Sequence, residues 1–562
     1  MYKLLAVSLS ITFLACGQEA SSKVNGYFPE WGPGATLNGF LVKNLVTTGA
    51  AAKLTYLTFA FAQVSSNGTC SMDNATDDVG AQYSAAQSVS GVADPASSTA
   101  LRGIFHQLQE LKQLYPIKVL VSVGGATLSG PISSAVSTST NRTNFVNSCI
   151  KTFIDGNFGL AQAYPGIFDG IDIDWEYPSN TTYPNGSTDK TNFTALMSLF
   201  RSSLGSQYLL TATGPAGPWN YEYMNLGAIA QSLNFFNVMT YDYDGPWSKT
   251  TGFVAPLYAP NGDLSVDQTI EAYRGAGVPS SKILLGLPFY AYRWTSVPSG
   301  SDYGMNETGT PQPTLPTSPT YSYAYVAALP NYSTSIHHDS TSTSPWLYTP
   351  YSVFYTFEDP TSANCKVHYA QHYGLAGVVI WDLSGDTSSA SLLKAISSDM
   401  ETTSNAGCPA FTDSAMYNFE TSTQGWVKYT PTNGLSGISS VAVSSTEFLE
   451  GSHSLAVTFD PTHYTSSPQV YVPAPAIAAG KTVQFYVWIP EGSTVVGIEP
   501  FVQDKNWAWT SNYVSTLYEN GWNIVTVTVP STAVTPLQEI GIQFTLSGAS
   551  SGTVYIDSVG PQ

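Results

Sequence analysis

The stretch "FDGIDIDWEY" (residues 168–177) places four carboxylates within eight residues, at Asp169, Asp172, Asp174 and Glu176. Only 10% of the chain is charged, so such a concentration of acids is unusual for this sequence. Side chains of a β-strand alternate between its two faces, so the last three acids share one face and the isoleucines and tryptophan take the other. In a closed parallel barrel the apolar face would pack under helices. The acids would then point inward and reach the C-terminal end of the barrel, where active sites of such barrels lie.

Seven further apolar runs recur along the chain, separated by segments with helical periodicity. Continuous β-branched runs are typical of parallel strands buried on both faces, and the intervening segments are typical of amphipathic helices. Eight β-then-α units in roughly 380 residues favour an α/β fold, a TIM (β/α)8 barrel. An open dinucleotide-binding sheet is disfavoured because no GxGxxG follows the first run. The eight runs begin at Val24, Leu54, Ile117, Gly166, Tyr208, Leu233, Ile283 and Gly374.

Changes in composition predict the domain boundaries. We expect the barrel over residues 21–402, with a small inserted subdomain at about 291–351, where Pro, Ser, Thr and Tyr are abundant. Residues 403–414 have the composition of a linker. Residues 415–562 alternate apolar and polar side chains between turn signals, which predicts an all-β sandwich of antiparallel strands.

The first 20 residues have the pattern of a signal peptide. One Lys precedes an apolar run that is too short to span a bilayer, so we expect secretion into the extracellular space. A lipid anchor at Cys16 is the less favoured alternative. The net charge of −19 and the lack of a basic cluster exclude nucleic-acid binding and an electrostatic membrane anchor. We expect no transmembrane segment and a monomer.

Cysteine and histidine spacing predicts disulfides and no metal in the barrel. Once Cys16 is set aside, four cysteines remain, and three pairings could join them. None is part of a CxxC motif, which argues against structural zinc. His368 and His372 are spaced like a zinc pair but lack the Glu of a HExxH site, so we expect no cofactor. The four remaining cysteines are Cys70, Cys149, Cys365 and Cys408.

The stacked acids themselves indicate acid catalysis. Three carboxylates at two-residue spacing cannot all be ionised in a buried space, so at least one holds a proton near neutral pH. An acid with a raised pKa at the mouth of a cleft suits a general acid. Asp169 is out of phase with the others and is expected to be structural. Calcium binding is disfavoured because calcium prefers oxygen ligands around a loop.

The run resembles the DxxDxDxE motif of family 18 glycoside hydrolases, the chitinases, at all four acids. "SVGG" (residues 122–125), "MTYD" (residues 239–242) and "GVVIWDLSGD" (residues 377–386) resemble three further motifs of the family. The resemblance covers roughly residues 23 to 400. It implies a secreted chitinase that cleaves β-1,4 linkages between N-acetylglucosamine units of chitin or its oligosaccharides.

The resemblance also implies roles for individual residues. Glu176 would protonate the glycosidic oxygen, and the acetamido oxygen of the substrate would attack the anomeric carbon, with net retention. Asp174 would orient that acetamide and stabilise the oxazolinium ion, while Asp172 would share a proton with Asp174. Tyr241 would donate to the acetamide carbonyl, and Asp242 would line the same subsite. The expected floor and wall of the sugar site are Trp381, Met239, Tyr27, Phe61, Tyr290 and Gly125.

One position departs from the family pattern. Many relatives carry a Trp directly after SxGG as a platform for the leaving sugar, and here that position is Ala126. Trp247 is the aromatic residue we expect to serve the leaving side in its place. The insertion resembles the α+β subdomain that deepens the cleft in one chitinase subfamily.

The C-terminal segment resembles jelly-roll modules of secreted bacterial glycoside hydrolases. Trp507, Trp509 and Tyr513 are candidate carbohydrate-stacking residues, and on a strand the two tryptophans would share a face. Burial of these rings in the sandwich core is the alternative. Some such modules hold a structural calcium near their first and last strands, which makes Glu420 and Asp557 candidate ligands.

Two other functions fit parts of this pattern. A catalytically silent chitin-binding lectin would normally lack the acid, whereas Glu176 is present. An endo-β-N-acetylglucosaminidase that cuts the chitobiose core of N-glycans shares the DxxDxDxE motif. The other motifs and the long insertion favour the chitinase.

Overall fold

Eight parallel strands close into a barrel in the computed structural model, because β1 pairs with β14 on one side and with β2 on the other. This confirms the predicted TIM barrel. The acids of the quoted stretch lie on β5 and directly after it. In order around the barrel, the strands are β1 (Lys23–Pro29), β2 (Tyr56–Val64), β4 (Lys118–Gly124), β5 (Gly170–Asp174), β6 (Leu209–Gly214), β7 (Phe235–Val238), β8 (Ile283–Pro288) and β14 (Gly377–Trp381).

The structure describes residues 23–561, apart from residues 35–36, 38, 179–184, 260–263, 313–321, 401, 403–406, 410–414, 450–451, 516 and 518. The predicted signal peptide with Cys16 and most of the predicted linker therefore lie outside the described residues. Within the described part, no helix has the length and hydropathy needed to cross a membrane.

Helices surround the barrel, and some of them, such as α4, α8 and α11, begin at a capping side chain. The Asp359 carboxylate accepts hydrogen bonds from the backbone N–H groups of Thr361 and Ser362, and Pro360 takes the first helical position of α11. Short 3₁₀ and π turns are η2 (Ala50–Lys53), η3 (Thr76–Gly80), η4 (Ile150–Ile154), η5 (Ser280–Lys282) and η7 (Leu383–Gly385). The α-helices are α1 (Val42–Thr47), α2 (Gly103–Leu114), α3 (Gly130–Ala135), α4 (Ser139–Cys149), α5 (Gly186–Leu204), α6 (Pro218–Tyr221), α7 (Leu226–Ser232), α8 (Val266–Gly275), α11 (Pro360–His372) and α12 (Ser391–Asp399).

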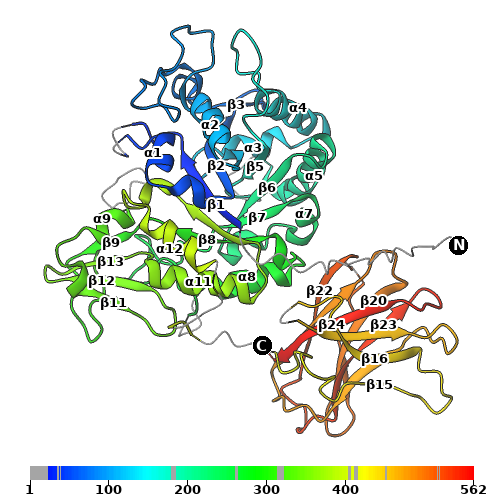
Figure 1. Ribbon diagram of the computed structural model, residues 1–562. Coiled ribbons are helices and arrows are strands. Elements are labelled where there is room, and N and C mark those ends of the chain that lie inside the picture. Colours follow the sequence, from blue (N-terminus) through cyan, green and yellow to red (C-terminus); the bar gives the residue numbers. More distant parts are fainter. Residues whose placement is uncertain are drawn as a thin grey trace, which may run out of the picture.

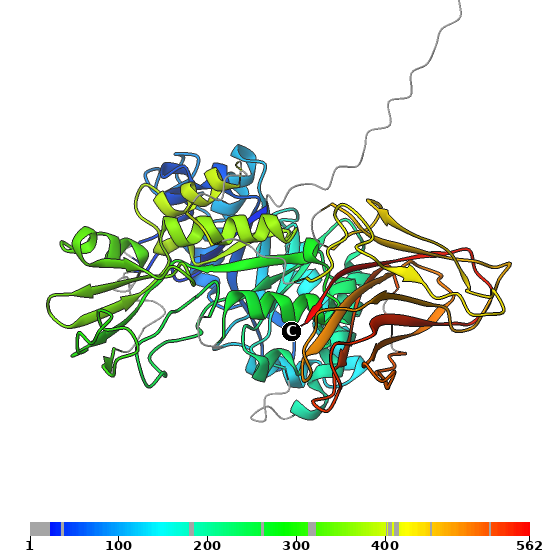
Figure 2. The same cartoon turned by 90° about the horizontal axis from the view of Figure 1, so that it is seen from below.

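An insertion between β8 and α11 forms its own antiparallel sheet, in the order β10-β9-β13-β12-β11. Its last strand ends at Thr356, five residues beyond the expected boundary at 351. The insertion projects from one side of the barrel (Figures 1 and 2). Its elements are β9 (Tyr292–Thr295), β10 (Thr310–Pro311), α9 (Tyr323–Ala327), α10 (Tyr332–Ser335), β11 (Ile336–His338), β12 (Pro345–Thr349) and β13 (Val353–Thr356).

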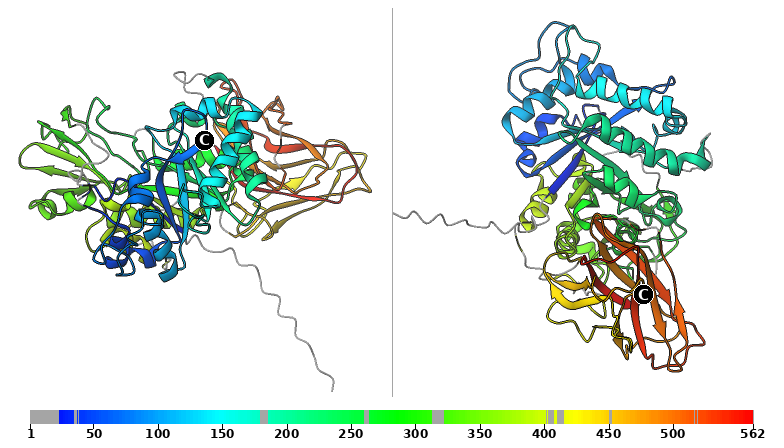
Figure 3. Two further views of the ribbon diagram at one scale, coloured as in Figure 1. Left: turned by 90° about the horizontal axis from the view of Figure 1, so that it is seen from above. Right: turned by 90° about the vertical axis from the view of Figure 1, so that its right-hand side faces the viewer.

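The C-terminal segment is a sandwich of two five-stranded antiparallel sheets, which confirms the predicted all-β fold. One sheet has the order β15-β18-β23-β20-β21 and the other β16-β17-β24-β19-β22. The sandwich lies at the opposite end of the barrel from the insertion (Figures 2 and 3). The sandwich strands are β15 (Val427–Lys428), β16 (Ile438–Ser444), β17 (Ser454–Phe459), β18 (Gln469–Pro473), β19 (Thr482–Ile489), β20 (Val495–Gln503), β21 (Trp509–Ser511), β22 (Gly521–Thr528), β23 (Glu539–Leu546) and β24 (Thr553–Pro561).

A short antiparallel strand, β3 (Cys70–Met72), pairs with β2 at the edge of the barrel sheet.

Two disulfides select one of the three cysteine pairings. Cys70 on β3 joins Cys149 at the end of α4. Cys365 on α11 joins Cys408, which follows the last helix of the barrel.

Candidate active site

Asp172 is fully buried and saturated with hydrogen-bond donors. Its Oδ2 accepts from the hydroxyls of Tyr27 at 2.8 Å and Ser122 at 2.7 Å. Its Oδ1 accepts from the Thr211 hydroxyl at 2.5 Å and the Asn237 amide at 3.1 Å. Burial raises the pKa of Asp172, and these four donors oppose that rise because they stabilise the carboxylate.

Asp174 faces Glu176. The two carboxyl groups hydrogen-bond to each other, and Asp174 Oδ1 also accepts from the Thr213 hydroxyl at 2.6 Å. Burial, followed by the negative charges of Glu176 and Asp172, raises the pKa of Asp174 well above its usual value. The expected sharing of a proton between Asp172 and Asp174 is therefore not the arrangement found. The oxygens of Asp172 are occupied by other donors, so Asp174 turns to the third acid.

Glu176 is held at the mouth of the barrel through its backbone. Its N–H donates to Ser129 Oγ at 3.0 Å, and the Ser129 hydroxyl lies 2.7 Å from the Gly125 carbonyl and 2.9 Å from the Asp174 carbonyl. Burial raises the pKa of Glu176 to about 7, a hydrogen bond from Tyr177 opposes the rise, and the charge of Asp242 adds to it. A carboxyl group with this pKa is protonated in a large fraction of molecules near neutral pH, as a general acid requires.

The SVGG motif provides space that larger residues would fill. A Cβ at Gly124, where φ is +119°, would lie 2.0 Å from the Asp174 carbonyl oxygen. A Cβ at Gly125, where φ is +91°, would lie 2.7 Å from the Phe61 ring. Both glycines are thus needed for the ends of β4 and β5 and the Phe61 ring to approach each other.

Asp242 is held by two tyrosines that the topology brings from elsewhere. Its Oδ1 accepts from Tyr290 Oη at 2.5 Å and from Tyr292 Oη at 2.7 Å. Tyr292 begins β9, so the inserted sheet contributes directly to this site. The neighbouring Tyr241 is 9% exposed, and burial raises the pKa of its hydroxyl well above 10, so it is a proton donor.

Trp381, at the end of β14, is surrounded by other aromatic rings. Its ring stacks on Phe61 at 5.6 Å between centroids, meets Tyr27 edge-on at 5.4 Å, and lies 6.3 Å from Trp31. Trp31 was not predicted as a site residue. The four rings form an apolar floor of the kind that packs against pyranose faces.

A cleft of about 1310 Å³ runs over these groups. Asp174, Glu176, Met239 and the other predicted barrel residues line it, except Asp172 and Gly125, which lie beneath the lining. Ala126 lines it as well. Tryptophans from two loops complete the wall: Trp219 is 62% exposed and Trp247 is 61% exposed. Each belongs to a Gly-Pro-Trp sequence that follows a barrel strand.

A family model described as "Glycosyl hydrolases family 18" matches residues 23–386. The chain belongs to this family. The residues matched include every cleft residue named above, from Tyr27 to Trp381. A second model, "Mannanase, galactose-binding domain-like", matches residues 417–558 in the sandwich.

Two chitinases of Streptomyces and one solved chitinase structure are similar to this chain. Chitinase C of Streptomyces lividans is 33% identical over 381 residues, covering 64% of this chain and 57% of that protein. Chitinase 63 of Streptomyces plicatus is 33% identical over 391 residues, covering 67% and 60%. The chain thus spans less than two thirds of the length of either relative. Among solved structures, the catalytic domain of psychrophilic chitinase B from Arthrobacter TAD20 matches with a TM-score of 0.60 at 30% identity, covering 70% of this chain and 97% of that domain.

In the sandwich, the predicted stacking residues are exposed. Trp507, Trp509 and Tyr513 are 60%, 40% and 52% exposed, so none of these rings belongs to the core. Trp507 precedes β21 in a turn with φ +65°, whereas Trp509 lies on the strand and stacks on Phe501 at 4.1 Å. The expectation that both tryptophans share one face of a strand was therefore wrong, because the hairpin turns at Trp507.

The predicted calcium ligands act as hydrogen-bond acceptors. Glu420 accepts from the backbone N–H groups of Ser452 and His453 and from the Ser452 hydroxyl, at 2.9–3.1 Å. Asp557 is buried and accepts from the Leu449 N–H at 2.8 Å. These N–H groups give Glu420 and Asp557 a role in holding the loop before β17. In the described ranges, no three His, Cys, Asp or Glu side chains are placed to hold a metal.

Several site residues escaped sequence reasoning. Ser129, Thr213 and Tyr292 contact the acids, and Trp219 and Trp31 line the cleft. Tyr177 lies in the acidic stretch and Thr213 in the apolar run that begins at Tyr208. Strand alternation on β6 would have placed Thr213 inside the barrel. Ser129 and Tyr292 carry no local signal, because only the approach of other strands gives them their partners.

Proposed function

We propose that the chain is a secreted chitinase that hydrolyses β-1,4 linkages between N-acetylglucosamine units with retention of configuration. The observation that carries this proposal is the hydrogen bond between Asp174 and Glu176 at the floor of an aromatic cleft, with Glu176 at a pKa of about 7. The chitinases among the relatives support the substrate class.

In the first step, Glu176 donates its proton to the glycosidic oxygen while the acetamido oxygen of the substrate attacks the anomeric carbon. The glycosidic C–O bond breaks, the leaving sugar departs as an alcohol, and an oxazolinium ion forms. The negative charge of Asp174 stabilises that ion, and the Tyr241 hydroxyl donates to the acetamide oxygen.

In the second step, the Glu176 carboxylate takes a proton from water as the water attacks the anomeric carbon from the side that the leaving sugar vacated. The oxazolinium ring opens and the acetamide is restored. Two inversions at one carbon give net retention, and Glu176 ends the cycle protonated.

We assign the leaving side of the substrate to Trp219 and Trp247. Both rings are exposed in the wall of the cleft, while Ala126 offers no ring at its position. Trp247 is supported edge-on by Tyr292 at 5.3 Å, so the residue that holds Asp242 also orients this ring. Exposed aromatic faces stack on the apolar faces of sugar rings.

We assign the sandwich a role in holding the enzyme on insoluble polysaccharide. The exposed Trp507, Trp509 and Tyr513 support this assignment, as does the match to a galactose-binding domain-like family.

One assay separates this function from its rivals. The purified protein is incubated with N-acetylglucosamine oligomers and, in parallel, with a high-mannose glycoprotein, and products are followed by mass spectrometry and anomeric NMR. We expect release of the β-anomer from oligomers only. Cleavage of the glycoprotein alone would indicate an endo-β-N-acetylglucosaminidase, and oligomer binding without turnover would indicate a lectin.

A further inference from the structure

The sandwich carries an aromatic cluster on the outside of one of its sheets. On β19, Phe485 and Val487 point into the sandwich core, so Tyr486 and Trp488 point outward. Across the sheet, Trp488 pairs with Trp522 and Tyr486 pairs with Ile524. We call this set the outer aromatic face: Leu449, Tyr486, Trp488, Trp522, Ile524 and Tyr555.

The outer aromatic face is covered although it lies outside the sandwich core. Tyr486 is 3% exposed and Trp522 is 7% exposed. Outward aromatic side chains on an antiparallel sheet normally face solvent. The barrel contacts this face at Tyr486 and Ile524, and the two bodies are adjacent in Figure 1.

The contact is built around a buried arginine on α8. The Tyr486 hydroxyl donates to Glu271 Oε2 at 2.8 Å, and Glu271 pairs with Arg274. The Arg274 guanidinium lies 5.1 Å from the centroid of the barrel's Tyr373 and 5.6 Å from that of Tyr486, so it lies between a ring of each domain. Arg274 is 1% exposed. A buried cation needs this carboxylate and these rings to offset its loss of hydration.

Small residues at the end of α8 allow the two domains to approach closely. Gly275, Ala276 and Gly277 form one side of a shallow hollow, and Asn523 and Ile524 of β22 form part of the other. A Cβ at Gly275 would lie 3.3 Å from Ile524 Cδ1, tighter than ordinary van der Waals contact. Gly275 is a helical residue, so a side chain there would be limited by this space alone.

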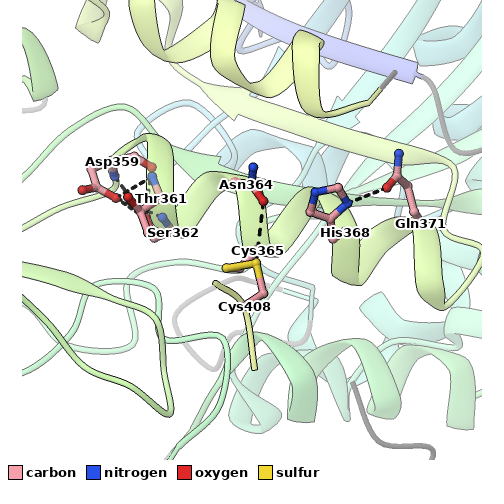
Figure 4. Close-up of a disulfide and its surroundings, with 8 residues drawn as sticks. All are labelled: Asp359, Thr361, Ser362, Asn364, Cys365, His368, Gln371 and Cys408. Atoms are coloured by element: carbon pink, nitrogen blue, oxygen red, sulfur yellow. Dashed lines mark hydrogen bonds between the residues drawn. A yellow bond between two sulfur atoms is a disulfide. The ribbon is translucent and has the colours of Figure 1, made fainter. Parts of the chain in front are cut away.

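The chain is tied near the same surface at Cys408. The Cys365–Cys408 disulfide ties the chain to α11 (Figure 4), the helix capped by Tyr373. Cys408 Sγ lies 3.6 Å from the Asn364 side-chain oxygen, and the His368 ring lies one turn along α11, hydrogen-bonded to Gln371. Residues 409–414 alone separate Cys408 from the sandwich. A tether this short gives a local concentration on the order of millimolar, so a weak contact is enough to stay closed.

We infer that the outer aromatic face is a permanent docking surface for the end of α8, so that the sandwich is held in one orientation relative to the cleft. The partner it fits is chemically specific: an arginine–glutamate pair beside a helix end made of small residues. The tryptophans of the β20–β21 hairpin are then presented at a constant angle to the cleft. This inference concerns the contact between the domains and does not depend on which polysaccharide is cleaved.

The test compares two lysine substitutions in the full chain. Gly275→Lys places a charged side chain against Ile524, while Gly548→Lys is the matched control, because nothing lies within 4 Å of a Cβ there. Small-angle X-ray scattering should fit one compact arrangement for the wild type and for Gly548→Lys, and an expanded ensemble for Gly275→Lys. Thermolysin should cut residues 409–414 about tenfold faster in Gly275→Lys, since cleavage follows the open population.

A milder variant guards against misfolding of Gly275→Lys. Tyr486→Ala removes both the ring over Arg274 and the hydrogen bond to Glu271, and it should also expand the scattering profile at unchanged oligomer turnover. Identical profiles and cleavage rates in all four proteins would overturn the inference. A wild-type profile that becomes compact only as protein concentration rises would overturn it too, because the face would then bind a second copy.

Discussion

The carboxyl group of Asp174 hydrogen-bonds to that of Glu176, while Asp172, two residues earlier on the same strand face, binds four other donors. Three acids at equal spacing along a strand thus have unequal environments. The four donors stabilise the Asp172 carboxylate against the effect of burial, while Asp174 and Glu176 share a hydrogen bond beside the cleft. Of the three, Glu176 has a pKa of about 7, which suits the transfer of a proton in acid catalysis.

Glu176→Gln should lower turnover of N-acetylglucosamine oligomers at least about 100-fold, because the amide keeps the shape but has no proton to donate. Oligomer binding, measured by calorimetry, should change little. Glu222→Gln, an exposed residue of the same type, serves as the control. Residual activity above roughly a tenth of wild type would remove Glu176 from the role of the acid.

Asp174→Asn should reduce turnover about 100- to 1,000-fold, because stabilisation of the oxazolinium charge and orientation of the acetamide are lost together. A cyclic thiazoline that mimics the oxazolinium should inhibit the wild type and bind the variant more weakly. Release of an inverted anomer by the wild type, together with no thiazoline inhibition, would contradict the substrate-assisted mechanism.

The activity should fall as pH rises through about 7, where Glu176 loses its proton. The charge of Asp242 contributes to the raised pKa of Glu176, so its removal stabilises the Glu176 carboxylate. Asp242→Asn should therefore move the alkaline limb of the kcat/KM profile to lower pH, whatever it does to the maximal rate. Asp302→Asn, exposed on the insertion, should leave the limb in place. An unchanged limb in Asp242→Asn would show that another group sets it.

Trp219→Ala and Trp247→Ala should each raise KM for long oligomers about 2- to 10-fold, the effect of losing one aromatic stacking contact. Dimers and trimers that do not reach these rings should be affected less. Tyr351→Ala, 81% exposed on the insertion, is the matched aromatic control. Equal effects on short and long substrates would place the two tryptophans outside the leaving side.

Trp509→Ala should weaken adsorption to insoluble chitin and slow its degradation, with turnover of soluble oligomers unchanged. Deleting the sandwich after Cys408 should have the same effects and also lower the Tm, because it exposes Arg274 and Tyr373. Adsorption is measured by pull-down and Tm by calorimetry. Failure of the full chain to adsorb to any insoluble glycan would contradict the binding role.

Sequence periodicity alone was enough for the barrel, the sandwich and the shared face of Asp172, Asp174 and Glu176. These features depend on local rules: alternation along a strand, helical spacing and the length of apolar runs. The family motifs added the expected roles of Tyr241 and Trp381.

Only the tertiary structure decided which groups each acid contacts and how the domains meet. Tyr27 reaches Asp172 across 145 residues of sequence, Tyr292 reaches Asp242 from an inserted strand, and Tyr486 reaches Glu271 across 215 residues. Such partners depend on closure of the barrel and on docking of the sandwich. No local pattern predicts these contacts, because the sequence around each residue alternates in the same way whether or not the distant partner is present.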